Sequence, residues 1–208
     1  QLTPTAPYGK QLPDNQQTET GYVTGNANMS GNVLLMHLNE QSGSIQDSSG
    51  SGNNGVGTNI AYNNPGKFNN SIGFNGSNSA INVPNSSSLN PTNAITMEAW
   101  VKWSVNPSTG QPWANIINKN GDDGYQIQHT STNSFFETAI RTNVKRTYIQ
   151  STTQAVAGNW YHVVGTWDNT TNLLKLYVNG NLERTGSLTG SIISSAQNVG
   201  IGKRSWND

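Results

Sequence analysis

Apolar and polar side chains alternate along much of the chain, most clearly at residues 95–103. Successive side chains of a β-strand point to opposite faces, so this period predicts a strand with one buried face. The apolar residues at every second position are Ile95, Met97, Ala99, Val101 and Trp103. We expect them to face a core, while the residues between them face the other way.

A second pattern predicts a β-hairpin. The runs Leu173–Val178 and Leu182–Ser187 flank the dipeptide Asn179-Gly180. Asn and Gly both tolerate the positive φ that a type I′ turn requires at its two central positions. We therefore expect these runs to be antiparallel neighbours.

Further runs of strand length recur, separated by Gly, Pro, Asn and Ser. They lie near residues 33–38, 55–62, 71–74, 80–83, 115–118, 125–128, 135–141, 147–152, 161–167 and 198–202. No segment has a helical period over about ten residues or more. Many short strands with turn residues between them predict an all-β fold, a two-sheet antiparallel jelly-roll sandwich.

The first 31 residues differ from the rest. Pro4, Pro7 and Pro13 interrupt a stretch rich in Gln, Thr and Asn that has no sustained period. This composition predicts an extended N-terminal arm or linker over residues 1–31. The sandwich then occupies residues 32–208, a length that all-β domains often reach as one unit.

Charge and composition argue against nucleic-acid binding and membrane insertion. The 11 basic and 11 acidic residues give a net charge of +0, and Lys and Arg are not clustered as nucleic-acid binding requires. No apolar stretch of about 18 residues predicts membrane insertion. The chain has no Cys, and its polarity comes from amide and hydroxyl side chains more than from charge. We expect an extracellular or cell-surface protein.

Four sequence patterns follow one another along the chain. They are Val33-Leu34-Leu35-Met36-His37-Leu38-Asn39-Glu40 with Asp47-Ser48-Ser49-Gly50, Gly66-Lys67-Phe68 with Ser71-Ile72-Gly73-Phe74, Ile95-Thr96-Met97-Glu98-Ala99-Trp100-Val101-Lys102, and Trp160-Tyr161-His162-Val163-Val164-Gly165-Thr166-Trp167-Asp168 with Leu176-Tyr177-Val178-Asn179-Gly180. Their order and spacing resemble the laminin-G-like (concanavalin A-like) jelly-roll superfamily, most of all the LamG modules of bacterial and archaeal surface proteins. The resemblance covers about residues 32–207. It implies the fold but no ligand, because the superfamily includes lectins, adhesins and enzymes.

The resemblance also raises a question about the last strand. LamG modules end in a closing strand, and this chain stops at Ser205-Trp206-Asn207-Asp208, where that strand would begin. Either the chain is a fragment or another segment closes the sheet. In the second case the open edge would pair with a neighbouring protein subunit by strand addition, and residues 1–31 are a candidate donor.

Catalytic motifs of the superfamily are missing from the sequence. Its hydrolases carry paired carboxylates in a Glu-x-Asp-x-Glu motif. No Glu of this chain has an acidic residue two positions away, and no Gly-x-Ser-x-Gly elbow occurs. We therefore expect a domain that is not an enzyme.

A structural calcium ion is the one cofactor that the sequence suggests. Calcium prefers six to eight oxygen ligands. Asp47, Asn53 and Asn54 offer one carboxylate and two amides in a Gly-rich loop, and the resemblance implies calcium in the equivalent loop of related modules. The alternative is a plain turn in which Asp47 accepts hydrogen bonds from local N–H groups.

Glycan binding would use an exposed aromatic ring surrounded by amides. Trp113, Tyr125 and Trp206 lie in predicted loops or at strand ends and are candidates for this role. Four other tryptophans are expected to pack in the sandwich. They are Trp100, Trp103, Trp160 and Trp167.

These observations favour a non-catalytic surface module for adhesion, display or assembly that belongs to a larger protein. The alternative is a lectin-like, carbohydrate-binding module. Possible partners are a glycan or a neighbouring subunit, with no nucleic acid and no membrane insertion.

Overall fold

The computed structural model describes residues 30–106, 114–130 and 133–203. The chain divides into two compact units, residues 1–32 and 33–208. Almost every described residue belongs to the second unit, and the fold below is that of this unit. The predicted arm at residues 1–31 lies almost entirely outside the described residues and stays a prediction.

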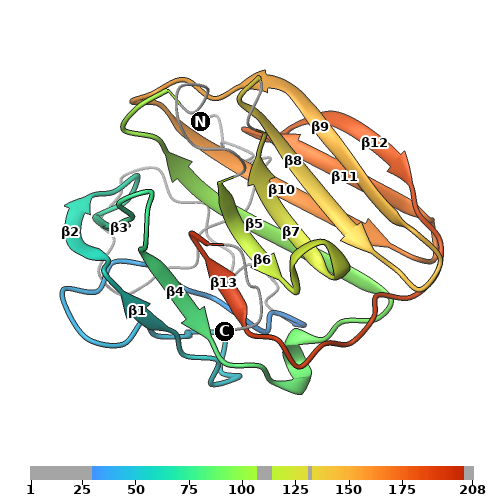
Figure 1. The fold of residues 1–208 in the computed structure, drawn as a ribbon, viewed down its shortest axis with the longest axis horizontal. Coiled ribbons are helices and arrows are strands. Elements are labelled where there is room, and N and C mark those ends of the chain that lie inside the picture. The colour runs from blue at the N-terminus through green and yellow to red at the C-terminus, as the bar shows by residue number, and fades with distance from the viewer. Residues whose placement is uncertain (1–29, 107–113, 131–132, 204–208) are drawn as a thin grey trace, which may run out of the picture. The chain divides into compact units, whose positions relative to one another are not determined.

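Two antiparallel sheets form the second unit (Figure 1). The larger sheet has seven strands in the order β1-β4-β13-β6-β7-β8-β9. Their bounds are β1 Val56–Thr58, β4 Ala80–Val83, β13 Val199–Ile201, β6 Asn115–Lys119, β7 Tyr125–His129, β8 Phe135–Arg141 and β9 Arg146–Gln154. The described residues contain no α-helix, only two short 3-10 turns, η1 Ser87–Leu89 and η3 Gly121–Asp123. The predicted all-β jelly-roll sandwich is confirmed.

The smaller sheet has four strands in the order β12-β11-β10-β5. Their bounds are β5 Ala94–Lys102, β10 Trp160–Asp168, β11 Leu173–Val178 and β12 Asn181–Ser187. A separate hairpin pairs β2 Ala61–Pro65 with β3 Asn70–Gly73. No helix of the described part is long and apolar enough to cross a membrane.

The core lies between the two sheets. Ile127, Phe136 and Ile140 enter it from the larger sheet, and Val163 and Leu176 from the smaller one. Trp167 is also buried there, and its indole N–H donates to the Leu188 carbonyl at 2.9 Å. Burying such side chains on the inner face of each strand is what the two-residue period predicts.

The predicted hairpin is confirmed. β11 and β12 pair across Asn179 and Gly180, whose φ angles are 49° and 80°. Two positive φ values in succession are the signature of a type I′ turn.

The predicted strand at residues 33–38 is wrong. The structure assigns it no strand, although Val33, Leu34, Met36 and Leu38 pack against the core. The Leu35 N–H donates to the Asp47 carboxylate and the Leu35 carbonyl accepts from the Ser48 N–H. A turn, and not a neighbouring strand, therefore holds this backbone.

Candidate binding face of the seven-stranded sheet

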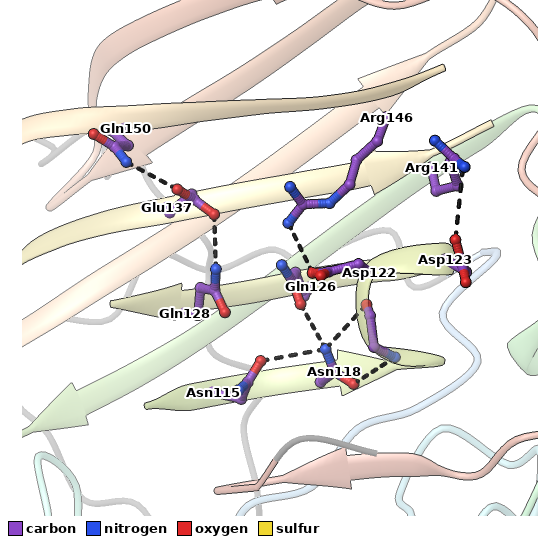
Figure 2. Close-up of polar contacts among 11 residues, drawn as sticks. Asn115, Asn118, Asp122, Asp123, Gln126, Gln128, Glu137, Arg141, Arg146 and Gln150 are labelled. Carbon is purple, nitrogen blue, oxygen red and sulfur yellow. Dashed lines mark hydrogen bonds and ion pairs between the residues drawn. The ribbon is translucent and has the colours of Figure 1, made fainter. Parts of the chain in front are cut away.

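The outer face of β6–β9 is polar. Strand register decides which side chains meet there: Asn118 pairs with Gln126, Gln128 with Glu137, and Glu137 with Gln150. Because paired residues point to the same face, amides and one carboxylate line up across four strands (Figure 2). We call this set the polar row; its members are Asn115, Asn118, Gln126, Gln128, Glu137 and Gln150.

The carboxylate of Glu137 is the centre of the polar row. It is only 2% exposed, and each of its oxygens accepts one amide hydrogen bond. Gln128 Nε2 donates to Oε1 at 2.7 Å, and Gln150 Nε2 donates to Oε2 at 2.9 Å. Charged acceptors make stronger hydrogen bonds than neutral ones, so Glu137 fixes the orientation of both amides.

At the other end of the row, Asn118 Nδ2 donates to Gln126 Oε1 at 2.6 Å and to Asn115 Oδ1 at 3.2 Å. Gln126 is 1% exposed, and its Nε2 has no hydrogen-bond partner among the described residues. A buried donor without an acceptor costs about 1–3 kcal/mol. The row thus holds one buried N–H group that lacks an acceptor among the described residues.

Charged pairs border the row (Figure 2). Arg146 Nη2 lies 3.1 Å from Asp122 Oδ1, and Arg141 Nε lies 3.7 Å from Asp123 Oδ1. Both aspartates belong to η3, between β6 and β7. Such partly exposed pairs add little stability, but they place charged groups at the rim of the polar face.

An exposed aromatic ring stands beside the row. Tyr148 on β9 is 57% exposed, lies opposite Ala139, and has the Arg146 guanidinium carbon 5.6 Å from its ring centroid. It precedes Gln150 by two positions, so both side chains share the outer face. The period-two pattern of β9 could have revealed Tyr148 from sequence, because Ile149 and Ser151 take the buried positions.

A comparison with known protein families identifies a family with this architecture. Residues 75–208 match the profile of Laminin_G_3, described as the concanavalin A-like lectin/glucanases superfamily. The chain belongs to this superfamily. The resemblance found in the sequence is thereby confirmed.

Solved structures show the same concanavalin A-like fold. The binding domain of Paraclostridial Mosquitocidal Protein 1 has a TM-score of 0.66 and 18% identity, over 86% of this chain and 45% of that chain. Domain 4 of AbnA, an extracellular GH43 arabinanase from Geobacillus stearothermophilus in complex with arabinotriose, has a TM-score of 0.58 and 20% identity, over 77% of this chain and 79% of that chain. The binding domain of botulinum neurotoxin DC in complex with SialylT has a TM-score of 0.57 and 20% identity, over 83% of this chain and 43% of that chain.

This concanavalin A-like chain therefore spans less than half of the two toxin chains. The identities are low enough that the three likenesses concern the fold alone. A search of curated proteins finds no match.

The predicted calcium ligands of this concanavalin A-like domain do lie together. Asp47 accepts hydrogen bonds from the N–H groups of Leu35, Ser49 and Asn53 and from the Ser49 hydroxyl. Burial raises the pKa of Asp47, but these hydrogen bonds outweigh it and hold the pKa below its usual value. The carboxylate therefore organises the loop as a hydrogen-bond acceptor.

The two asparagines are also engaged. Asn54 Oδ1 accepts from the Asp47 N–H at 2.8 Å, and Asn53 Oδ1 accepts from the Ser86 hydroxyl at 2.7 Å. In this arrangement a calcium ion would have to displace donors from Asp47, whose two oxygens already accept four hydrogen bonds. The geometry fits a turn better than a calcium loop, and calcium binding stays a prediction.

The three aromatic candidates from the sequence have different outcomes. Tyr125 is 5% exposed and belongs to the core, where its hydroxyl donates to the Leu89 carbonyl at 3.0 Å and burial raises its pKa. Its ring offers no accessible face for stacking. Trp113 and Trp206 lie outside the described residues.

The expected packing of Trp100 in the core is wrong, because Trp100 is 40% exposed on the outer face of β5.

Proposed function

We propose that this domain binds carbohydrate without catalysing a reaction, through the outer face of β6–β9. The observation that carries the proposal is Tyr148, an exposed ring beside an ordered row of amides and one carboxylate. An aromatic face can pack on the apolar face of a sugar ring, while amides and carboxylates bind its hydroxyl groups.

Gln150, the partly buried member of the polar row, supplies such a hydrogen-bonding group in a fixed arrangement. Glu137 holds the amide of Gln150 beside Tyr148, so Gln150 is oriented before a ligand arrives. Such preorganisation lowers the entropy lost on binding.

The same geometry supports a role without catalysis. A retaining glycosidase places two carboxyl groups about 5 Å apart across the scissile bond. Glu137 is the only carboxylate of the polar row, and its two oxygens are held by Gln128 and Gln150. The nearby carboxylates of Asp122 and Asp123 pair with arginines.

Solved structures with the same fold support carbohydrate as the class of ligand. Domain 4 of the arabinanase was solved with arabinotriose and the neurotoxin domain with SialylT. At these identities the support is by analogy of fold. A carbohydrate-binding role also agrees with adhesion at a cell surface, and the amide-rich composition supports an extracellular location.

A glycan array tests the proposal. The array should contain arabino-oligosaccharides and sialylated oligosaccharides, and it should be probed with the wild-type chain and with Tyr148→Ala. We expect selective binding by the wild type that is lost in the variant. Wild-type binding to none of the glycans would contradict the proposal.

A further inference from the structure

The outer edge of β5 has no partner strand among the described residues. β5 is the last strand of the four-stranded sheet, and it runs for nine residues beside β10 without a register shift. An edge strand offers unpaired N–H and C=O groups to another chain unless it is short, bulged or covered.

Backbone geometry identifies the groups on that edge. The N–H of His162 donates to the Asn179 side chain, and its carbonyl accepts from the Asn179 N–H, so the backbone of His162 points to β11. Trp100 lies directly opposite His162. In an antiparallel pair such a residue directs its own backbone groups away from the partner. Hydrogen-bonding groups on the outer edge therefore belong to Thr96, Glu98, Trp100 and Lys102.

The other edges of the two sheets differ from β5. β1 has only three residues. The edges β9 and β12 are tied to one another, since Glu183 of β12 accepts hydrogen bonds from Thr152 and Thr153 of β9. Within the described residues, β5 is the long edge that is neither bulged nor tied to another edge strand.

The core beneath β5 is also incompletely covered. Ile95, Ala99 and Val101 point inward but are only partly buried, whereas Val163 and Trp167 on the adjacent β10 are almost fully buried. A strand added beside β5, with apolar residues at alternate positions, would cover these three side chains. β5 itself has this pattern.

Trp100 marks the middle of the edge. Its indole is 40% exposed, stacks on His162 with 5.0 Å between ring centroids, and meets Phe68 edge-on at 5.9 Å. Exposed tryptophans are enriched in protein interfaces, where they supply much of the binding energy.

We propose that β5 pairs antiparallel with β5 of a second copy of this chain, with the two-fold axis at Trp100. In that register Glu98 of each copy lies opposite Lys102 of the other, and symmetry supplies this pair twice. Opposite charges across an antiparallel pair are stabilising, and isologous dimers are the commonest protein assembly. The two four-stranded sheets become one continuous sheet, on the side of the sandwich away from the polar row.

Charge reversal tests the register. Sedimentation equilibrium of the full chain should give a dimer for the wild type. Glu98→Lys and Lys102→Glu each place like charges opposite one another twice, and each should weaken dimerisation by about tenfold or more. The double variant Glu98→Lys/Lys102→Glu restores opposite charges and should recover the wild-type affinity. This rescue separates loss of pairing from loss of folding.

Several results would overturn the proposal: a wild type that stays monomeric up to millimolar concentration, a dimer indifferent to charge reversal, or open-ended oligomers. A monomer whose β5 amides gain protection only when a different polypeptide is added would assign the edge to another partner. Tyr148→Ala should dimerise normally. The dimer and the carbohydrate site can therefore succeed or fail independently.

Discussion

Gln150 Nε2 donates a hydrogen bond to Glu137 Oε2 at 2.9 Å, from a partly buried position to a buried carboxylate. The pair joins β8 to β9 and connects the partly buried end of the polar row to its buried centre. Its loss should change both stability and binding, because the buried member orients the accessible one.

We expect Glu137→Gln to lower the free energy of unfolding by about 1–3 kcal/mol. The substituted amide keeps the volume of the side chain, but its NH₂ group faces a donor from Gln128 or Gln150. Urea denaturation followed by tryptophan fluorescence measures the change. Gln154→Ala, at an exposed position of β9, is the control and should cost less. Equal stability of Glu137→Gln and wild type would show that the carboxylate does not organise the row.

Asp47→Asn tests the loop that begins the domain. Asparagine keeps one acceptor oxygen in place of a carboxylate with four hydrogen bonds, so we expect a loss of about 1–2 kcal/mol at neutral pH. Thermal unfolding of both proteins measures this loss.

The pH dependence of that difference has a definite sign. The folded-state pKa of Asp47 is lowered, so its contribution is complete above the unfolded value of about 3.9 and is lost as pH falls through the folded pKa. The difference between wild type and Asp47→Asn should therefore shrink below about pH 4. A difference that is constant from pH 7 to pH 2 would contradict this assignment.

Calcium at the same loop has its own test. If Asp47, Asn53 and Asn54 bind calcium, EDTA should lower the melting temperature of the wild type and leave that of Asp47→Asn unchanged, since ligand binding to the folded state alone stabilises it. Wild-type melting temperatures that are equal with EDTA and with added calcium would refute the site.

The sequence predicted those elements whose determinants are local. The alternation in Ile95–Trp103 identifies β5, and Asn179-Gly180 identifies the β11–β12 hairpin, because side-chain period and turn conformation depend on neighbouring residues only. The run at residues 33–38 failed for the opposite reason. Its apolar side chains do reach the core, but a strand also needs a hydrogen-bonding partner, which a hydropathy pattern does not reveal.

The sequence did not predict the candidate site, for a related reason. Asn118 and Gln126, like Glu137 and Gln150, meet through the register of paired strands, and register is not visible in any one segment. Alternation indicated which residues share a face, but it could not show that the polar face would be buried and connected. The sequence consequently predicted a role in binding for aromatics in loops or at strand ends, such as Tyr125, whereas the exposed ring of the polar face is Tyr148.

Calorimetric titration tests the central claim most directly. The oligosaccharide that binds best on the array is titrated into wild type, Tyr148→Ala, Tyr148→Phe and Leu182→Ala, the last removing an exposed apolar side chain from the other sheet. We predict that Tyr148→Ala weakens affinity by about tenfold or more, in line with the loss of one aromatic stacking contact, while Tyr148→Phe stays within about threefold of wild type and Leu182→Ala is unchanged. Equal affinities for Tyr148→Ala and wild type would show that carbohydrate does not bind at the outer face of β6–β9.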